Sequence, residues 1–589
     1  MAGIVPAELA FDGNGIPFAP AYDDCYFSAS GGPEQARHVF LGGNQLPDRW
    51  QGRDFVILET GFGLGLNFLC TWQAWQANPG RRLHYVAIEK HPFRLDDLRR
   101  LHERWPELAP LAAKLQAQWP LPLSGLHRLD FGDIVLTLGF GDAEALLPRL
   151  TLAADAIYLD GFAPVKNPEM WSDAVFAALA QRAATDATLA SWSVFDDMMF
   201  RLARAGFRLE KRPGFGTKRY MLAGRMPGPE KKSVPAGRRR ICVIGAGVAG
   251  AAAAHALAAR GHEVVVLESA DAPAQGASGN HVGVFRPLPS LDDSRLARLL
   301  RAGFLLGRRR FAALPASANA RMGWTGALHV ARDARHEATQ QRIAAQLPAE
   351  FCRFVDRDAA SALAGWPVEL GGWWFPQAGW INPPSLVRAL LAGVEVRCSH
   401  TVRSLEELDA DDIVLANGIG APTLAPEFKL PIRAGRGLVS HIPETATPPF
   451  GIVATRLGYV TPALDGMRCA GATMMLDDLD PAPRLDDHVE NLQRLDMILP
   501  GFGGRALDPA RLDGRVSFRP MSPDRLPIAG PLSASEGLWI IDGFGARGLV
   551  FAPICAELLA CQIGGEPLPV EDDLAAAVAP ARFRGKRGM

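Results

Sequence analysis

ICVIGAGVAGAAAAHALAARGHEVVVLE, residues 241–268, is the segment that decides the fold class. An apolar run leads into Gly245-Ala-Gly247-Val-Ala-Gly250, an alanine-rich stretch follows, and a second apolar run ends at Glu268, eighteen residues after the last of these glycines. This order predicts a strand, a phosphate-binding turn, a helix and a second strand, which is the fingerprint of a dinucleotide-binding fold. An acidic residue at the end of the second strand accepts hydrogen bonds from a free ribose, which favours FAD or NAD over NADP.

The same segment is apolar enough to be considered as a membrane span over residues 241–259. Its glycines, its use of alanine in place of leucine and the internal His255 favour a buried strand that runs into a sheet-packed helix. The N-terminus carries Glu8 and Asp12 and has no basic stretch before an apolar core, which argues against a secretory signal. We therefore expect a cytoplasmic protein that does not enter a membrane.

Three later segments favour FAD. They read GASGN at 276–280, DIVLANGIG at 412–420 and LWIIDGFGARGL at 538–549. The candidate flavin-binding residues in the first and third are Ser278, Gly279, Asn280, Gly543, Gly545 and Gly548. A helix that begins in the third segment would point its N-terminus at the flavin and stabilise the negative charge of the reduced ring. An ordinary turn is the alternative for residues 417–420 and 543–548.

A second glycine loop lies near the N-terminus, where an apolar run is followed by ETGFGLGLN at 59–67. Its candidate ligand-binding residues are Glu59, Gly61, Gly63, Gly65 and Asn67. Glycines let the backbone turn tightly against a ligand, and the helix N-terminus beyond them favours carboxylate or phosphate groups. Thirty residues after Glu59 a strand ends at Glu89, where a carboxylate would meet a ribose diol. The pattern predicts an adenosine-bearing ligand, either a dinucleotide or S-adenosylmethionine, and a solvated strand end is the alternative for both acids.

Two aspartates favour S-adenosylmethionine. Asp142 follows a strand, where methyltransferases place an acid near the adenine, but it could equally cap the helix that starts at residue 143. Asp160 stands at the carboxyl end of an apolar strand, before a Gly-Phe-Ala-Pro turn, and ligand sites of open α/β sheets lie at that edge. An Asx turn is the alternative for Asp160.

The composition limits the possible architectures. A length of 589 residues at about 150 residues per domain predicts about four folding units, and 48% hydrophobic residues exclude a disordered chain. The 62 basic and 63 acidic residues leave a net charge of −1, so a nucleic-acid partner has to be held by local basic patches. The eight cysteines include no Cys-x-x-Cys pair, so we expect reduced thiols and no metal site.

Over nearly its whole length the chain resembles the MnmC family of bifunctional tRNA 5-methylaminomethyl-2-thiouridine biosynthesis proteins. In the first half the resemblance rests on YDDCYFSASGG, VFLGGNQLPDRW, ETGFGLGLNF, LDGFAPVKNPEMW and GFGTKRYML. In the second half it rests on GAGVAGA, GASGN, FRPMSPDRLPIAG, GFGARGL and AELLACQIGGEPLP. Two segments depart from the family pattern: His281-Val282 after GASGN, and residues 190–207, where an arginine that could meet tRNA is missing.

The resemblance also implies the fold class and the domains. The run RMPGPEKKSVPAGRRR at 225–240 breaks the apolar periodicity between the two glycine loops. We therefore place a methyltransferase domain at 1–225, a linker at 226–239 and an FAD-dependent oxidoreductase domain at 240–589. The expected fold class is α/β: an N-terminal Rossmann-like class I methyltransferase fused to a C-terminal α+β oxidoreductase of the D-amino-acid or glycine oxidase type. The oxidoreductase domain would contain an FAD-binding subdomain and a β-rich substrate subdomain.

The function implied is a pair of steps on the wobble uridine, position 34, of tRNA. The FAD domain removes the carboxymethyl group of 5-carboxymethylaminomethyl-(2-thio)uridine, and the S-adenosylmethionine-dependent domain methylates the exposed amine. Arg519 is the candidate catalytic cation for the substrate carboxylate, with a surface pair to Asp524 as the alternative. Asp160 is the candidate that accepts the N–H bonds of the amine.

Two further groups of residues are candidates for the tRNA contact. Aromatic residues that could stack on a splayed base, or else pack in the core, are Tyr22, Tyr26, Phe162 and Trp171. Basic residues that could form a phosphate patch, or else a solvated face, are Lys211, Arg212, Lys218 and Arg219. We expect a monomer.

Two other functions are compatible with the sequence. One is an FAD amino-acid oxidase fused to a small-molecule amine N-methyltransferase, which the near-zero net charge permits. The other is a tRNA-binding scaffold with decayed cofactor sites, against which the intact glycine loops, Glu89, Asp160 and Glu268 argue.

Overall fold

The computed structural model describes residues 3–28, 31–228, 237–504, 507–533 and 536–584. The chain divides into two compact units, one built from Ala2–Ala236 with Gly564–Asp573, the other from Gly237–Ile563 with both chain ends. Of the expected linker 226–239, residues 229–236 lie outside the described residues.

The N-terminal unit is built on an eight-stranded sheet with the order β10-β11-β9-β8-β4-β5-β7-β6. Its strands are β4 Asp54–Glu59, β5 Arg82–Glu89, β6 Gly125–Asp130, β7 Ile134–Phe140, β8 Ala154–Tyr158, β9 Ala183–Ser191, β10 Arg208–Pro213 and β11 Tyr220–Arg225. The five strands from β9 to β7 run parallel, and β6, β10 and β11 are antiparallel additions at the edges. The central strand β4 is apolar and buried over most of its length because helices cover both faces.

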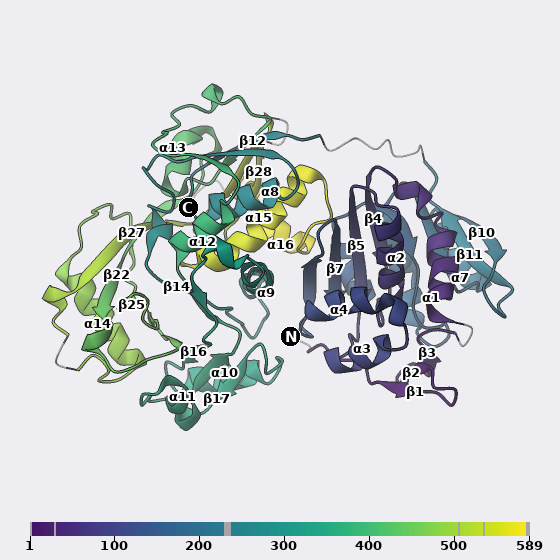
Figure 1. The fold of residues 1–589 in the computed structure, drawn as a ribbon, viewed down its shortest axis with the longest axis horizontal. Helices are drawn as coiled ribbons and strands as arrows, with labels where there is room; N and C mark the ends of the chain where they lie inside the picture. The colour runs from purple at the N-terminus through teal and green to yellow at the C-terminus, as the bar shows by residue number, and fades with distance from the viewer. Residues whose placement is uncertain (1–2, 29–30, 229–236, 505–506, 534–535, 585–589) are drawn as a thin grey trace. The chain divides into compact units, whose positions relative to one another are not determined.

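Two separate cores explain which helices pack on which face of this sheet. On one face α2 (Leu66–Ala77) and α4 (Ala109–Ala117) pack on side chains such as Phe55 and Tyr85; Figure 1 shows both helices in front of β4, β5 and β7. On the other face α6 (Asp173–Arg182) and α7 (Asp196–Arg204) pack on side chains such as Leu58. The remaining helices of this unit are α1 Gly32–Ala36, α3 Leu95–His102 and α5 Ala143–Leu146.

The chain reverses its direction of progress across the sheet at β4, which has β5 on one side and β8 on the other. Such a switch point opens a crevice at the carboxyl ends of the strands. Glu59 is the last residue of β4, Glu89 the last of β5, and Asp160 follows β8 by two residues, so the topology gathers three carboxyl groups at this edge. A small sheet of β1 (Ala10–Phe11), β2 (Pro17–Ala19) and β3 (Asp24–Cys25) is tied to the same edge, because Ala163 N donates to Asp24 Oδ2 at 2.8 Å.

The C-terminal unit contains a six-stranded sheet of order β20-β13-β12-β21-β29-β28, parallel except for β28. Its strands are β12 Arg240–Ile244, β13 Glu263–Leu267, β20 Glu395–Arg397, β21 Asp412–Leu415, β28 Ile528–Ser533 and β29 Leu538–Asp542. Residues 241–259 form β12 and the eleven-residue helix α8 (Val248–Ala258), as the strand-and-helix interpretation predicts. The helices α12 (Pro383–Leu390) and α15 (Gly548–Gly564) complete this part. Among the described residues, Gly545–Gly564 is the one helical stretch long and apolar enough to cross a membrane, and 78% of its apolar window is buried, as in a core helix.

The rest of this unit is β-rich. A nine-stranded sheet has the order β17-β18-β16-β23-β24-β25-β22-β26, and β27 also pairs with β22; a three-stranded sheet has the order β14-β19-β15. The strands of the larger sheet are β16 Ala327–Val330, β17 Arg353–Val355, β18 Gly372–Phe375, β22 Arg433–Pro443, β23 Val453–Thr455, β24 Tyr459–Val460, β25 Met467–Gly471, β26 Met475–Leu476 and β27 Asp513–Met521. The smaller sheet contains β14 Gly283–Phe285, β15 Met322–Gly323 and β19 Gly379–Ile381. The helices are α9 Arg295–Ala312, α10 Ala334–Ala344, α11 Arg357–Ala364, α13 Ala421–Leu424 and α14 Leu485–Ile498, and α16 is Asp572–Val578.

A short segment late in the chain, Gly564–Asp573, packs with the N-terminal unit. Arg128 on β6, whose side chain is 2% exposed, donates to Pro567 O at 3.2 Å and pairs with Glu566 at 3.3 Å. Leu568 N donates to the carbonyl of Thr151 at 3.1 Å. Residues more than 400 positions away in the sequence thus bind to β6, the edge strand of the eight-stranded sheet.

We predict that Glu566→Ala destabilises the N-terminal unit. The substitution leaves the buried guanidinium of Arg128 with less compensating charge, which lowers the free energy of unfolding of this unit by roughly 1–3 kcal/mol. Amide hydrogen exchange should rise in β6 and β7 and stay unchanged in β12 and β13. Glu103→Ala, an exposed position of the same unit, is the control; equal exchange in both variants would contradict the prediction.

Candidate active sites

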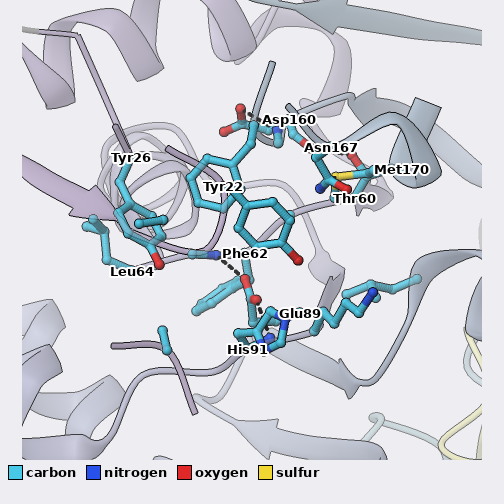
Figure 2. A pocket seen from close by; sticks show the side chains of 18 of the residues that line it. Tyr22, Tyr26, Thr60, Phe62, Leu64, Glu89, His91, Asp160, Asn167 and Met170 are labelled. Atoms are coloured by element: carbon cyan, nitrogen blue, oxygen red, sulfur yellow. Dashed lines mark hydrogen bonds between the residues drawn. The ribbon is translucent and has the colours of Figure 1, made fainter. Parts of the chain in front are cut away.

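The N-terminal unit has a cavity of about 330 Å³ at the carboxyl ends of its parallel strands. Predicted residues that line it are Gly61, Gly63, Asn67, Glu89, Asp142, Asp160, Tyr22, Tyr26 and Phe162. Figure 2 shows the aromatic rings of Tyr22 and Tyr26 and the carboxyl groups of Glu89 and Asp160 around this cavity. Residues from five separate parts of the sequence therefore meet at one place.

The glycine loop between β4 and α2 has the conformation that its sequence predicts. Gly63 and Gly65 have positive φ values of +53° and +78°, which side-chain-bearing residues rarely adopt. A Cβ on Gly61 would lie 3.1 Å from the carbonyl oxygen of Asp160, so the loop after β4 and the loop after β8 touch. Because α2 begins at Leu66, its first-turn N–H groups face this loop.

Glu89 is held by the same loop. Gly63 N donates to Glu89 Oε2 at 2.7 Å, and His91 N donates to Oε1 at 2.7 Å (Figure 2). Burial raises the pKa of Glu89, and the two backbone donors oppose that effect. The carboxylate is therefore oriented before any ligand arrives, with its remaining lone pairs available to hydroxyl groups in the cavity.

Asp160 and Glu59 are joined by one amide. Asn67 Nδ2 donates to Glu59 Oε1 at 2.8 Å and to Asp160 Oδ2 at 2.7 Å. Gly161 N donates to Asp160 Oδ1 at 2.9 Å. Burial raises the pKa of Asp160 to about 6. Asp160 lines the cavity, whereas Glu59 is completely buried behind it.

Asp142 both caps a helix and lines the cavity, the two roles that its sequence position suggested. Its Oδ1 accepts from Glu144 N at 2.9 Å and caps α5, while its side chain also lines the cavity. Lys90, which sequence reasoning missed, pairs with Asp142 at 3.0 Å and with Glu169 at 3.1 Å. In the sequence, the position of Lys90 directly after Glu89 was the signal that could have identified it.

The aromatic candidates separate into two groups. Tyr22 stacks on Phe162 with centroids 4.7 Å apart, and Tyr26 meets the same ring edge-on at 5.2 Å. Trp171 is 4% exposed, belongs to the core beneath α6, and donates to Phe162 O at 2.9 Å. Trp171 therefore supports the Phe162 loop and is not placed to stack on a base, which corrects that expectation.

The basic candidates lie on β10 and in the turn that connects β10 to β11. Lys211 pairs with Asp196 at 3.1 Å and Arg212 pairs with Glu210 at 2.5 Å. The remaining two lie over aromatic rings: Lys218 is 4.4 Å from the Trp192 ring, where burial lowers its pKa to about 8, and Arg219 is 4.9 Å from the Tyr220 ring. In the departing segment 190–207, α7 exposes Phe200.

The second glycine loop, in the C-terminal unit, is set by close backbone packing. A Cβ on Gly250 would lie 1.9 Å from the carbonyl oxygen of Gly245, and one on Gly245 (φ +105°) would lie 2.6 Å from Ala416 O. Only glycine fits at either position. Glu268 accepts from Ala246 N at 2.7 Å and from Ala270 N at 2.9 Å, so the acid at the end of β13 is bound to the glycine loop.

The GASGN loop is fixed from two directions. Ser278 Oγ accepts from Val248 N at 2.9 Å, at the start of α8. Arg515 on β27 donates to the carbonyl oxygens of Gln275 and Gly276 and, at 3.3 Å, to Asn280 Oδ1. A Cβ on Gly279 would collide with the guanidinium of Arg515 at 2.4 Å. Arg515 was missed in the sequence because its partners lie about 235 positions away.

The departure His281-Val282 lies next to this loop. His281 contacts Leu464 O through Nε2 at 2.8 Å, and Val282 is fully buried. In the C-terminal glycine segment, Gly543 and Gly545 have φ values of +72° and +54°, and Gly548 starts α15. Asp542, another residue that sequence reasoning missed, is 3% exposed, and burial raises its pKa to about 7.

Arg519 is not a surface residue. It is 7% exposed on β27, and its Nη1 donates to Thr473 O at 3.2 Å. Asp524 pairs with Arg582 at 2.8 Å instead, so the alternative of an Arg519–Asp524 pair is wrong. Tyr459 is close enough to interact electrostatically with Arg519. A buried guanidinium with no carboxylate partner among the described residues is suited to bind an anionic substrate.

Comparisons with known proteins agree with this division. Residues 240–562 match the family described as FAD dependent oxidoreductase, and residues 106–227 match S-adenosyl-L-methionine-dependent methyltransferase. The solved glycine oxidase of Geobacillus kaustophilus, 19% identical, matches with a TM-score of 0.50, covering 59% of this chain and 100% of that one. The α/β fold class, with its C-terminal oxidase-type part, is confirmed.

Both cofactors fit the residues present. Glu89 and Asp142, which line the cavity of the N-terminal unit, would hold the ribose and adenine of S-adenosylmethionine. Glu268 and the loop around Gly247 would hold the ribose and phosphates of FAD. This loop needs glycine at Gly245 and Gly250, because a side chain at either position would collide with backbone.

The relatives cover the whole chain. A protein of Azoarcus sp. (strain BH72) is 50% identical over 98% of both chains, and one of Aromatoleum aromaticum is 51% identical over 100% of this chain and 99% of its own. Both are named tRNA 5-methylaminomethyl-2-thiouridine biosynthesis bifunctional protein MnmC. With both units and both cofactor families accounted for, the chain belongs to the MnmC family of bifunctional tRNA-modifying proteins.

Proposed function

We propose that this protein modifies the wobble uridine, position 34, of tRNA in two steps. The first removes the carboxymethyl group of 5-carboxymethylaminomethyl-(2-thio)uridine, and the second methylates the resulting aminomethyl group. The observation that carries the proposal is the near-complete match to relatives named for this biosynthesis, together with a candidate site for each cofactor in one chain. We further propose that it acts as a cytoplasmic monomer, without a membrane.

In the oxidation, the chain's part is to bind and orient the substrate. When bound, FAD would supply a hydride acceptor for the CH2 of the carboxymethylamino group; hydrolysis of the resulting imine would then release glyoxylate and leave the aminomethyl group. Arg519 binds the carboxylate of that group, and burial strengthens this charge-assisted interaction because water does not compete. Thr473 O fixes the guanidinium, so the CH2 is presented in one orientation.

In the methylation, Asp160 orients and deprotonates the amine. When bound, S-adenosylmethionine supplies the methyl group. The Asp160 carboxylate accepts an N–H bond of the aminomethyl group, aligns its lone pair and takes up a proton. A pKa of about 6 leaves Asp160 ionised at neutral pH while keeping it more basic than an ordinary aspartate.

The stacked pair of Tyr22 and Phe162 supports a nucleobase as the substrate of this cavity. Aromatic rings at the cavity wall offer flat faces to a splayed wobble base. Lys218 and Arg219, which no carboxylate neutralises among the described ion pairs, are suited to contact the tRNA backbone.

We predict that Asp160→Asn blocks the second step only. Mass spectrometry of wobble nucleosides, after incubation with S-adenosylmethionine of tRNA that carries 5-carboxymethylaminomethyl-(2-thio)uridine, should show the aminomethyl nucleoside accumulating and the methylated nucleoside reduced at least about 100-fold. Asp173→Asn, an exposed aspartate of the same unit, is the control. Loss of the oxidation step in Asp160→Asn would contradict the two-site assignment, and activity on free carboxymethylamines without tRNA would favour the small-molecule alternative.

Arg519→Met tests the oxidation site. Losing a charge-assisted contact worth about 1.5–3 kcal/mol should raise KM for the carboxymethylamino substrate about 10- to 100-fold, with methylation of a preformed aminomethyl substrate unchanged. Steady-state oxidation kinetics measure the effect, and the exposed Arg511→Met is the matched control. Unchanged oxidation kinetics would remove Arg519 from the site.

The pH dependence of methylation follows from Asp160. Because its pKa is raised to about 6 and the ionised form is the active one, methyl transfer should be half-maximal near pH 6 and reach its plateau about one pH unit higher. Below pH 6 the rate should fall about tenfold per pH unit. Single-turnover methylation measured at a series of pH values checks this, and a rate that rises on acidification would contradict it.

A further inference from the structure

The carboxyl group behind the methyltransferase cavity, that of Glu59, is not used by the mechanism above. Glu59 ends β4 and is 0% exposed, so it does not reach a substrate. It is nevertheless connected to Asp160 through the side-chain amide of Asn67. Glu59 and Asp160 share one amide donor, so their protonation states decide how much negative charge lies at the methyl-transfer site.

The surroundings of Glu59 supply no positive charge. The titratable groups that face it are Asp160 after β8, Tyr85 and Glu89 on β5, and Tyr158 on β8. No lysine, arginine or histidine of the described residues forms an ion pair with Glu59. Its Oε2 atom is buried, and the hydroxyl of Tyr85 is the polar group beside it; their interaction lowers the pKa of Glu59 by less than burial raises it.

The Asn67 amide has only two hydrogens, and both are already used. One is donated to Glu59 Oε1 at 2.8 Å and the other to Asp160 Oδ2 at 2.7 Å. A single neutral amide does not compensate two negative charges when one of the carboxyl groups, that of Glu59, is cut off from solvent, since an uncompensated buried carboxylate is costly. One of the two groups must therefore be neutral, as in other pairs of close carboxyl groups.

We propose that Glu59 is the neutral, protonated partner at neutral pH, and that through Asn67 it keeps Asp160 as the single oriented carboxylate of the site. Glu59 is then a positioning residue. Its acid proton lies on Oε2, the oxygen that Asn67 does not contact, beside the phenol of Tyr85. This inference rests on the proposed methyl transfer at Asp160.

The electrostatics agree with this division of roles. Burial, followed by the repulsion of Asp160, raises the pKa of Glu59 well above its usual range, whereas the pKa of Asp160 is raised only to about 6. As the pH rises, Asp160 therefore ionises first, while Glu59 keeps its proton. A neutral Glu59 adds no repulsion against the methyl-transfer site.

Infrared spectroscopy of the full-length protein reads out the proton directly. Asp542 is also buried and its pKa is raised to about 7, so it contributes its own band to every spectrum, and Glu59 is read from the difference between spectra. At neutral pH the wild-type spectrum minus that of Glu59→Gln, an isosteric neutral replacement, should show the C=O band of a protonated buried carboxyl group. The wild-type spectrum minus that of Asp173→Asn should show no such band. Acidification through about pH 6 should add C=O intensity that Asp160→Asn lacks. A difference spectrum of wild type minus Glu59→Gln without the band at neutral pH would overturn the proposal.

The pH profile of methylation gives a second, independent measurement. If Glu59 is neutral, Glu59→Gln leaves the midpoint of the acid limb where it is in the wild-type protein. An ionised Glu59 would instead raise the pKa of Asp160, so its removal would move the midpoint down by about one pH unit or more. Asn67→Ala removes a hydrogen bond that favours the ionised form of Asp160, so this variant should move the midpoint up.

The two proposals can fail separately. If the wild-type protein forms no methylated nucleoside, the proposed function fails, but the infrared band of Glu59 is measured without substrate and still decides its protonation. If methylation occurs and the band is missing, the proposed function stands and the role of Glu59 does not.

Discussion

The hydrogen bonds of Asn67 to Glu59 and Asp160 connect three parts of the methyltransferase unit that are distant in sequence. Asn67 lies in the first turn of α2, Glu59 ends β4 and Asp160 follows β8. The close approach of Gly61 to the Asp160 carbonyl and the bond from Thr60 Oγ1 to that same oxygen, at 2.6 Å, bring the two strand ends together. These hydrogen bonds fix Asp160 at the wall of the cavity and Glu59 behind it.

In the oxidoreductase unit, other contacts hold the glycine loop in place. Its glycine loop is narrow because Gly250 packs against the carbonyl of Gly245, and Glu268 is tied to the loop through Ala246 N. The long strand β27 holds the GASGN loop through Arg515, and Arg519 lies four residues further along the same strand. Side chains four residues apart on a strand point to the same face, which places both guanidinium groups on one side of the sheet.

Much of the fold and part of each site could be predicted from local sequence. The order of apolar strand, glycine turn and helix identified β4–α2 and β12–α8, and the acids at strand ends identified Glu89 and Glu268. Burial, however, decides what the individual residues do. Asp142 turned out to cap a helix as well as line the cavity, Trp171 lies in the core, and Arg519 lacks the Asp524 partner that its sequence neighbourhood suggested.

Local sequence was sufficient to predict the two nucleotide-type folds and the positions of their glycine loops, because these depend on residues within about thirty positions of one another. Which carboxyl groups share a donor, and which cations lack a carboxylate partner among the described residues, depends on the tertiary structure. It also decided that residues 564–573 complete the first unit through Arg128. Those interactions join side chains up to 439 positions apart, and their strength depends on burial and geometry, which no local pattern of residues encodes.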